Sequence, residues 1–235
     1  MIKDIDCFIL CGGEGRRLKK ISGRVPKPMI RIGRRVFLDI VIDYLRKFGF
    51  KRFILGIGYQ AHFIKKYYKK HKIPGIEIVF SQECRPLGTG GAVKKAQRFI
   101  KSEVFFVLNG DSFSEFNPGN FIKFYEQKKA SFLILLRKVK ASKDYGSITT
   151  DRQSRITSFN EKSSSTHGNF VNGGVYLFSK KVFPEMPKQA RFSLEYDFFP
   201  RMLGKGLYGY KEPGFFIDIG TPERYFAAKK YFLKD

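Results

Sequence analysis

The sequence is poor in cysteine and has no long apolar runs. Its three cysteines form no C-x-x-C pair, and Cys7 and Cys11 lie too far apart along a predicted strand for a disulfide, which indicates a reducing compartment. The longest apolar run, Phe132 to Leu136, is too short to cross a bilayer. Charged residues at positions 3, 4 and 6 stand where a signal peptide needs an apolar stretch. We therefore predict a soluble, cytoplasmic protein without membrane insertion.

The sequence also lacks a serine-, glycine- or proline-rich linker and any internal repeat. Its 235 residues are 43% hydrophobic and include 26 phenylalanines, which suffices for a sizeable core and excludes the disordered classes. We therefore predict one domain over residues 1–235. The oligomeric state is open.

Acidic residues are few compared with basic ones. Aspartate and glutamate number 21 against 45 lysines and arginines, so the net charge is +24. This surplus favours polyanionic partners, namely nucleotides, nucleic acid or an anionic membrane face. Two segments, 63–72 and 224–234, mix lysines with aromatics as nucleic-acid binders do. Their aromatics have helical spacing, which favours amphipathic helices with a solvated lysine face, and no nucleic-acid partner is expected.

A glycine-rich turn follows the first apolar run. Residues 5–11 are too few for a helix and predict a buried strand, directly followed by Gly12, Gly13 and Gly15. Glycines allow backbone N–H groups to approach an anion closely. The spacing fits neither the dinucleotide motif G-x-G-x-x-G nor a Walker A loop. A tight strand-to-helix turn would also account for these glycines.

Two basic residues follow this loop. Arg17 and Lys27 add positive charge, and Pro26 and Pro28 restrict the backbone on both sides of Lys27. A stiff segment that presents an ammonium group is typical of a binding site for phosphate.

Strand-like and helix-like segments alternate along the first half of the chain. This order predicts an α/β fold with a Rossmann-like, mostly parallel central sheet covered by helices. The second half predicts short strands in a small acceptor-binding lid that returns to the sheet at residues 215–220. The predicted helices are 36–49, 61–71, 92–101, 194–203 and 222–232, and the strands of the first half are 52–59, 76–81 and 104–109.

Further motifs follow predicted strands. Ligands bind beyond the carboxyl ends of parallel strands, so the first loop, the glycine-rich segment 81–92 and Asp111 should share one edge of the sheet. Asp111 and Asp218 each end an apolar run and would suit Mg²⁺, although an Asx-turn or helix cap is the commoner role.

The segment LCGGEGRRL...PKP resembles the signature of the sugar-1-phosphate nucleotidyltransferases. The resemblance implies that Arg17 and Lys27 grip a nucleoside triphosphate, with Mg²⁺ as cofactor. Arg16 replaces the usual threonine, and residues 20–22 replace a Pro-Leu-Thr run. By the same resemblance, the nucleotide is contacted by Leu10, Gly12, Gly13, Gly15, Glu83, Gly88 and Thr89, the metal by Asp111 and Asp218, and the sugar phosphate by Gly146, Glu161, Lys162 and Asn172.

Motifs of this family occur in order from CGGEG to DIGTP, and within it they look most like the D-glycero-D-manno-heptose 1-phosphate guanylyltransferases. The resemblance implies transfer of GMP from GTP to a sugar 1-phosphate. Mannose-1-phosphate guanylyltransferases and uridylyl- or thymidylyltransferases are the alternatives within the family. A basic, non-catalytic nucleotide- or RNA-binding protein is the alternative of another class, and a regulatory binder of nucleotide sugars is a further one.

Overall fold

The computed structural model describes residues 2–139, 146–160 and 170–233. Its α-helices are α1 (Lys19–Ser22), α2 (Phe37–Arg46), α3 (Ala61–Lys70), α4 (Gly88–Ala96), α5 (Pro118–Gln127) and α6 (Pro222–Phe232). Its strands are β1 (Asp6–Leu10), β2 (Arg31–Ile32), β3 (Arg35–Val36), β4 (Arg52–Ile57), β5 (Glu77–Gln82), β6 (Val104–Asn109), β7 (Ser112–Ser114), β8 (Phe132–Lys138), β9 (Ser147–Thr150), β10 (Ile156–Asn160), β11 (Phe170–Ser179), β12 (Leu207–Lys211) and β13 (Phe216–Asp218).

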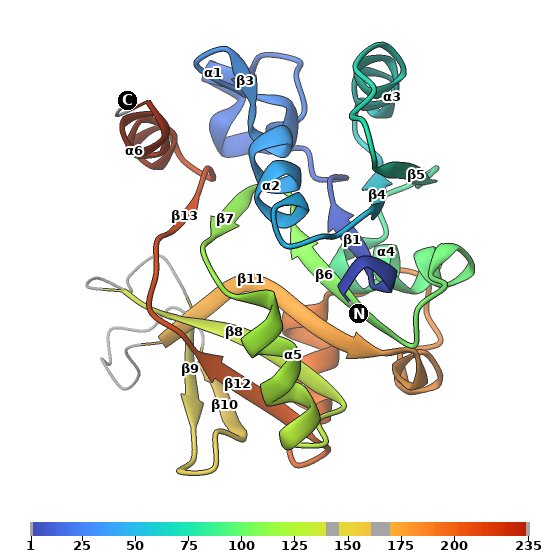
Figure 1. Cartoon of the computed structure of the whole chain (residues 1–235), viewed down its shortest axis with the longest axis vertical. Helices are drawn as coiled ribbons and strands as arrows, with labels where there is room; N and C mark the ends of the chain where they lie inside the picture. The colour runs from blue at the N-terminus through green and yellow to red at the C-terminus, as the bar shows by residue number, and fades with distance from the viewer. Residues whose placement is uncertain (1, 140–145, 161–169, 234–235) are drawn as a thin grey trace.

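A nine-stranded sheet forms the centre of the molecule (Figure 1). Its main order is β10-β9-β11-β6-β1-β4-β5, and β8 pairs with both β11 and β12. β1 is parallel to β4 and β6, and β4 is parallel to β5. β11 is antiparallel to β6, β8 and β9. All strands of this sheet except β10 and β11 therefore point the same way, which confirms the mostly parallel sheet.

Both faces of the sheet are buried. Alternate residues of β1 face opposite sides, so that Cys7 and Ile9 join one apolar cluster and Phe8 joins the other. The first cluster includes residues of α2, α3, α5 and α6, and the second includes residues of α4 and the segment 182–202. None of the helices in the described part of the chain has the length and apolarity that a membrane crossing needs.

Seven predicted elements are confirmed to within three residues at each end, namely α2, α3, α6, β1, β4, β5 and β6. The helix predicted over 92–101 is wrong in its bounds, because α4 already begins at Gly88. The helix predicted over 194–203 is not an α-helix. The N–H groups of Asp197 and Phe198 both donate to the carbonyl of Ser193, which widens the turn, and Pro200 has no N–H to continue a helix.

The place where the second half of the chain returns to the central sheet differs from the prediction. Strands β8 to β12 extend the central sheet, and the chain rejoins it where β12 runs parallel to β8. Residues 216–218 do not return to the main sheet, because β13 pairs with β7 in a separate two-stranded sheet.

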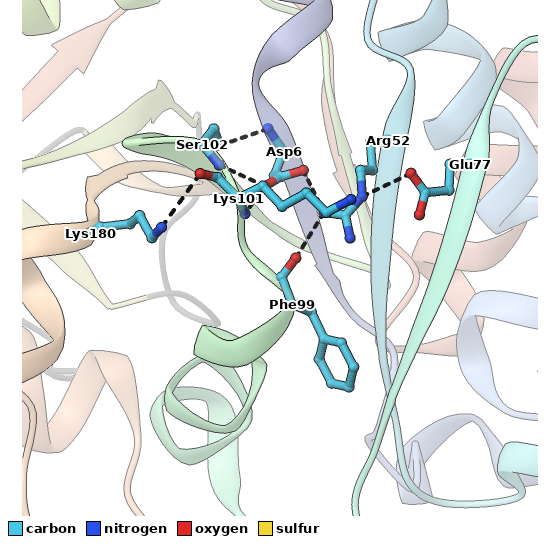
Figure 2. A network of polar contacts seen from close by, with 7 residues as sticks. All are labelled: Asp6, Arg52, Glu77, Phe99, Lys101, Ser102 and Lys180. Atoms are coloured by element: carbon cyan, nitrogen blue, oxygen red, sulfur yellow. Dashed lines mark hydrogen bonds and ion pairs between the residues drawn. The ribbon is translucent and has the colours of Figure 1, made fainter.

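A polar network ties the amino ends of the parallel strands together (Figure 2). Arg52, at the start of β4, donates to Asp6 at 2.7 Å, to Glu77 at 2.9 Å and to the carbonyl of Phe99 at 2.8 Å. Asp6 also accepts from the backbone N–H groups of Lys101 and Ser102 at 2.5 and 3.0 Å. Burial acts to raise the pKa of Asp6, but these hydrogen bonds and the charge of Arg52 outweigh it and lower the pKa. The network lies at the edge of the sheet opposite to the motif-bearing loops.

Candidate active site

The loop after β1 is packed closely against its neighbours. The carbonyl of Gly12 accepts from the N–H of Tyr59 at 3.2 Å, and a Cβ on Gly12 would lie 3.1 Å from the Glu83 carboxylate. Gly15 has a φ of +63°, and a Cβ there would lie only 2.5 Å from Cγ of Lys27. Gly15 is therefore required both by its left-handed backbone and by the lysine stem that crosses it.

Lys27 is held in place along its length. Pro26 precedes a tight helical turn, Lys27–Met29, in which Pro28 is buried. The Lys27 ammonium forms an ion pair with Asp111 at 2.8 Å, and the side chains are 12% and 38% exposed, respectively. The lysine is thus anchored by the protein, while its carboxylate partner remains open to solvent.

The backbones of the two predicted metal ligands lie close together: Asp218 ends β13, and Asp111 directly precedes β7, the strand that pairs with β13. Asp218 of β13 is opposite Ser112 of β7, and the N–H of Ile219 donates to the carbonyl of Asp111 at 2.9 Å. Asp218 accepts from the N–H of Gly220 at 2.8 Å and forms an ion pair with Arg224. Both carboxylates are therefore paired with a cation from the protein, Lys27 on one side and Arg224 on the other.

The second glycine-rich segment, 81–92, runs into α4. Gly88, Gly90 and Gly91 form the first turn of this helix, and a Cβ on any of them would lie within 2.5 Å of Phe192 or Ala190. These glycines accommodate the segment 190–192, although Gly88 also borders the cavity described below.

Glu83 and Thr89 are both held by hydrogen bonds. Glu83 accepts from the N–H of Leu87 at 3.0 Å, and burial raises its pKa although this bond and the charge of Lys95 act to lower it. Thr89 donates to Glu195 at 2.7 Å and accepts from the N–H of Leu194 at 2.8 Å.

A cavity of about 920 Å³ opens at the carboxyl ends of β1, β4, β5 and β6. This volume lies in the range of cavities that bind small molecules. Asn172 and Asp218 lie outside its lining, and Glu161 and Lys162 lie outside the described residues. The other predicted site residues all line it, namely Leu10, Gly12, Gly13, Gly15, Arg17, Lys27, Glu83, Gly88, Thr89, Asp111 and Gly146.

The lining also includes residues that the sequence reasoning missed. Arg85 and Arg191 add two cations to Arg17 and Lys27, which favours a polyanionic ligand. Glu195 and Tyr196 reach the cavity from the wide turn that was predicted as a helix. The sequence does contain a signal for this segment: two acidic residues, Glu195 and Asp197, stand among the aromatic residues of FSLEYDFF.

The chain is similar to known proteins over most of its length. The family model described as nucleotidyl transferase matches residues 7–235. The D-glycero-alpha-D-manno-heptose 1-phosphate guanylyltransferases of Campylobacter jejuni and Aneurinibacillus thermoaerophilus are each 37% identical to this chain, covering 94% and 96% of it and 97% of each relative. The crystal structure of HddC from Yersinia pseudotuberculosis matches with a TM-score of 0.88 at 36% identity, over 97% of this chain and 99% of that one. A second HddC structure, complexed with GMP-PN, matches with a TM-score of 0.86.

Proposed function

The chain belongs to the nucleotidyl transferase family, and we propose that it transfers GMP from GTP to D-glycero-D-manno-heptose 1-phosphate. One observation carries the choice of substrates: two heptose 1-phosphate guanylyltransferases match this chain over 97% of their own length. The products are pyrophosphate and a GDP-activated heptose.

The reaction is a direct displacement at phosphorus. A phosphate oxygen of the heptose 1-phosphate attacks the α-phosphorus of GTP, and a new O–P bond forms. The bond between the α-phosphorus and the oxygen bridging to the β-phosphorus breaks, and pyrophosphate leaves with that electron pair. No covalent enzyme intermediate is needed, so the residues of the chain position the two substrates and neutralise their charge.

Arg17 and Lys27 hold the triphosphate in this proposal. Both line the cavity beside the glycine loop, and Lys27 is fixed by the turn at Pro26 and by the stem contact with Gly15. Charges that are already in position need no reorganisation as the transition state forms.

Asp111 and Asp218 fit a divalent cation. Mg²⁺ is usually bound by one or two carboxylates together with phosphate oxygens and waters. The backbones of the two aspartates lie side by side, because Asp218 pairs with Ser112 and the next residue, Ile219, donates its N–H to the carbonyl of Asp111. A cationic ammonium already lies 2.8 Å from Asp111, so this carboxylate is suited to a positive partner. When bound, Mg²⁺ supplies charge neutralisation for the phosphate oxygens.

Glu83 is proposed to select the base. Its carboxylate borders the cavity near Gly12, and a carboxylate accepts from the two kinds of N–H on the Watson–Crick edge of guanine. Gly88 and Thr89 also line the cavity, directly after Leu87, whose N–H donates to Glu83. Leu10, Gly12 and Gly13 complete the nucleotide side of the proposal.

The sugar phosphate is proposed to bind on the opposite side. Gly146 lines the cavity, and the half-buried Asn172 is joined to the lining residue Glu195 through Tyr176. Glu161 and Lys162 remain proposals from the sequence resemblance. We also propose that the chain is a single domain. We propose a cytoplasmic location, because the donor is a nucleoside triphosphate and all three cysteines are free.

A panel of substrates tests this function. Pyrophosphate release is measured with GTP, ATP, CTP, UTP and dTTP against heptose, mannose and glucose 1-phosphates, with and without Mg²⁺. We expect turnover to be fastest with GTP and heptose 1-phosphate in the presence of Mg²⁺. A preference for UTP or dTTP would contradict guanylyl transfer, and turnover with mannose but not heptose 1-phosphate would contradict the sugar. Salt-sensitive RNA binding without any pyrophosphate release would favour a non-catalytic binder.

A further inference from the structure

The Glu195 carboxylate in the cavity wall accepts hydrogen bonds from three hydroxyl groups. Tyr176 donates to Oε1 of Glu195 at 3.1 Å, while Thr89 and Ser193 donate to Oε2 at 2.7 and 2.8 Å. Glu195 borders the cavity, whereas Tyr176 is fully buried behind it. An ionised carboxylate only accepts hydrogen bonds, so each of these hydroxyl protons points toward Glu195.

One branch of this cluster continues to Asn172. Tyr176 accepts from Nδ2 of Asn172 at 2.9 Å, and Oδ1 of Asn172 accepts from the N–H of Gly174 at 2.9 Å. Burial, and then the charge of Glu195, raises the pKa of Tyr176, so its hydroxyl remains a donor. Every hydrogen bond in the chain Gly174–Asn172–Tyr176–Glu195, called here the Glu195 chain, therefore has a fixed direction.

The direction is set at the two ends. A backbone N–H cannot become an acceptor, and a carboxylate cannot become a donor. Glu195→Gln would break this pattern. The single side-chain oxygen of glutamine would be needed as the acceptor for Thr89 and Ser193, so its NH₂ group would face Tyr176. The Tyr176 proton would then lose its carboxylate acceptor. Turning the Asn172 amide to accept that proton would place its NH₂ against the N–H of Gly174.

The Glu195 chain links the two sides of the cavity. Its carboxylate is bonded to Thr89 at the start of α4, which belongs to the proposed nucleotide side. Its far end lies on β11, at the asparagine proposed to contact the sugar phosphate. Asn172 uses one amide proton and one oxygen lone pair within the chain, which leaves one of each for a ligand.

We propose that Glu195 is a positioning residue for the acceptor substrate, heptose 1-phosphate. Its charge fixes which side of the Asn172 amide donates a hydrogen bond to the sugar and which side accepts one. This inference rests on the proposed function and adds a residue that selects the sugar phosphate without contacting the reacting atoms. It requires that loss of the Glu195 charge and loss of the Tyr176 hydroxyl have the same selective effect.

The test compares Glu195→Gln, Tyr176→Phe and the double variant with the wild type. KM and kcat are measured for heptose 1-phosphate and for GTP. We expect each single variant to raise KM for heptose 1-phosphate about tenfold, which is the loss of about 1.4 kcal/mol of binding, with KM for GTP within about threefold of the wild type. Because both variants interrupt the same chain, the double variant should be no worse than the more impaired single variant.

Ser193→Ala is the matched control. It also removes a hydroxyl from Glu195, but from Oε2, and it removes the cap whose oxygen accepts from the N–H groups of Glu195 and Tyr196. We expect a lower Tm with the KM values for both substrates within about twofold of the wild type. The positioning role is overturned if the control matches Glu195→Gln, if both KM values rise equally, or if the two single effects multiply. A wild-type protein without turnover would contradict the proposed function as well.

Discussion

Replacing Gly15 with alanine tests whether Lys27 must be held in place. The added Cβ would lie 2.5 Å from Cγ of Lys27, whereas carbon atoms in contact are about 3.5 Å apart, so the lysine stem must move by about 1 Å. Its ammonium lies 2.8 Å from Asp111, and a shift of this size breaks that contact. A 1 Å misplacement at an active site costs about 100-fold in rate. We expect kcat/KM for GTP to fall by about that factor in a pyrophosphate-release assay.

The same substitution also strains the backbone, and Gly23→Ala isolates that part. Gly23 has a φ of +58°, close to the +63° of Gly15, but a Cβ there meets no atom within 4 Å. Both variants should lose about 1–2 kcal/mol of stability, which lowers Tm by roughly 2–8 °C. Only Gly15→Ala should lose activity. Equal activity in the two variants, at matched fractions folded, would refute the reasoning.

Three other substitutions test separate parts of the structure. Lys27→Ala should lower kcat at least about 100-fold with little change in Tm, because it removes a charge aimed at the triphosphate, and undiminished pyrophosphate release would contradict that role. Asp218→Asn should raise the Mg²⁺ concentration for half-maximal rate about tenfold or more, as a Mg²⁺ titration would reveal; an unchanged midpoint would exclude Asp218 as a ligand. Asp6→Ala should cost about 3 kcal/mol at pH 7, because it leaves Arg52 without its least exposed partner. The pKa of Asp6 is lower in the folded state, so its stabilisation is present above about pH 4 and is lost as pH falls through the lowered value. The free energy of unfolding, measured by urea denaturation at a series of pH values, should therefore fall less steeply at acid pH in this variant than in the wild type. An unchanged dependence on pH would contradict the lowered pKa.

The first half of the fold was predictable because each element carries its own pattern. β6 is a run of apolar residues that ends at Asn109, and α2 buries a regular apolar face, so neither needs information from distant residues. The helix α5 was missed although its start signal is present, an Asn-Pro pair in which Asn117 caps the N–H of Asn120 at 3.1 Å.

The second half depends on contacts that a local pattern does not contain. Gly90 favours a loop by its own preference, but it lies in α4, and the ring of Phe192 occupies the space that a side chain would need there. The strand β12 includes Gly209, and Leu136 lies where a Cβ on that glycine would be. Neither contact is visible from neighbours in the sequence.

The candidate site divides in the same way. The rule that parallel strands end at one edge predicted that the first glycine loop, the segment 81–92 and Asp111 lie together, and the structure places residues of all three around one cavity. The contact between Thr89 and Glu195 joins residues 106 positions apart. It depends on how the wide turn after residue 193 packs on α4, so sequence reasoning missed Glu195 and Tyr196.

An isotope experiment tests the central claim most directly. Heptose 1-phosphate labelled with ¹⁸O in its phosphate is incubated with GTP, Mg²⁺ and the protein, and both products are analysed by mass spectrometry. Attack by the sugar phosphate on the α-phosphorus predicts a GDP-heptose that retains every ¹⁸O atom and pyrophosphate that contains none. Labelled pyrophosphate, or GMP with unchanged heptose 1-phosphate, would contradict the account.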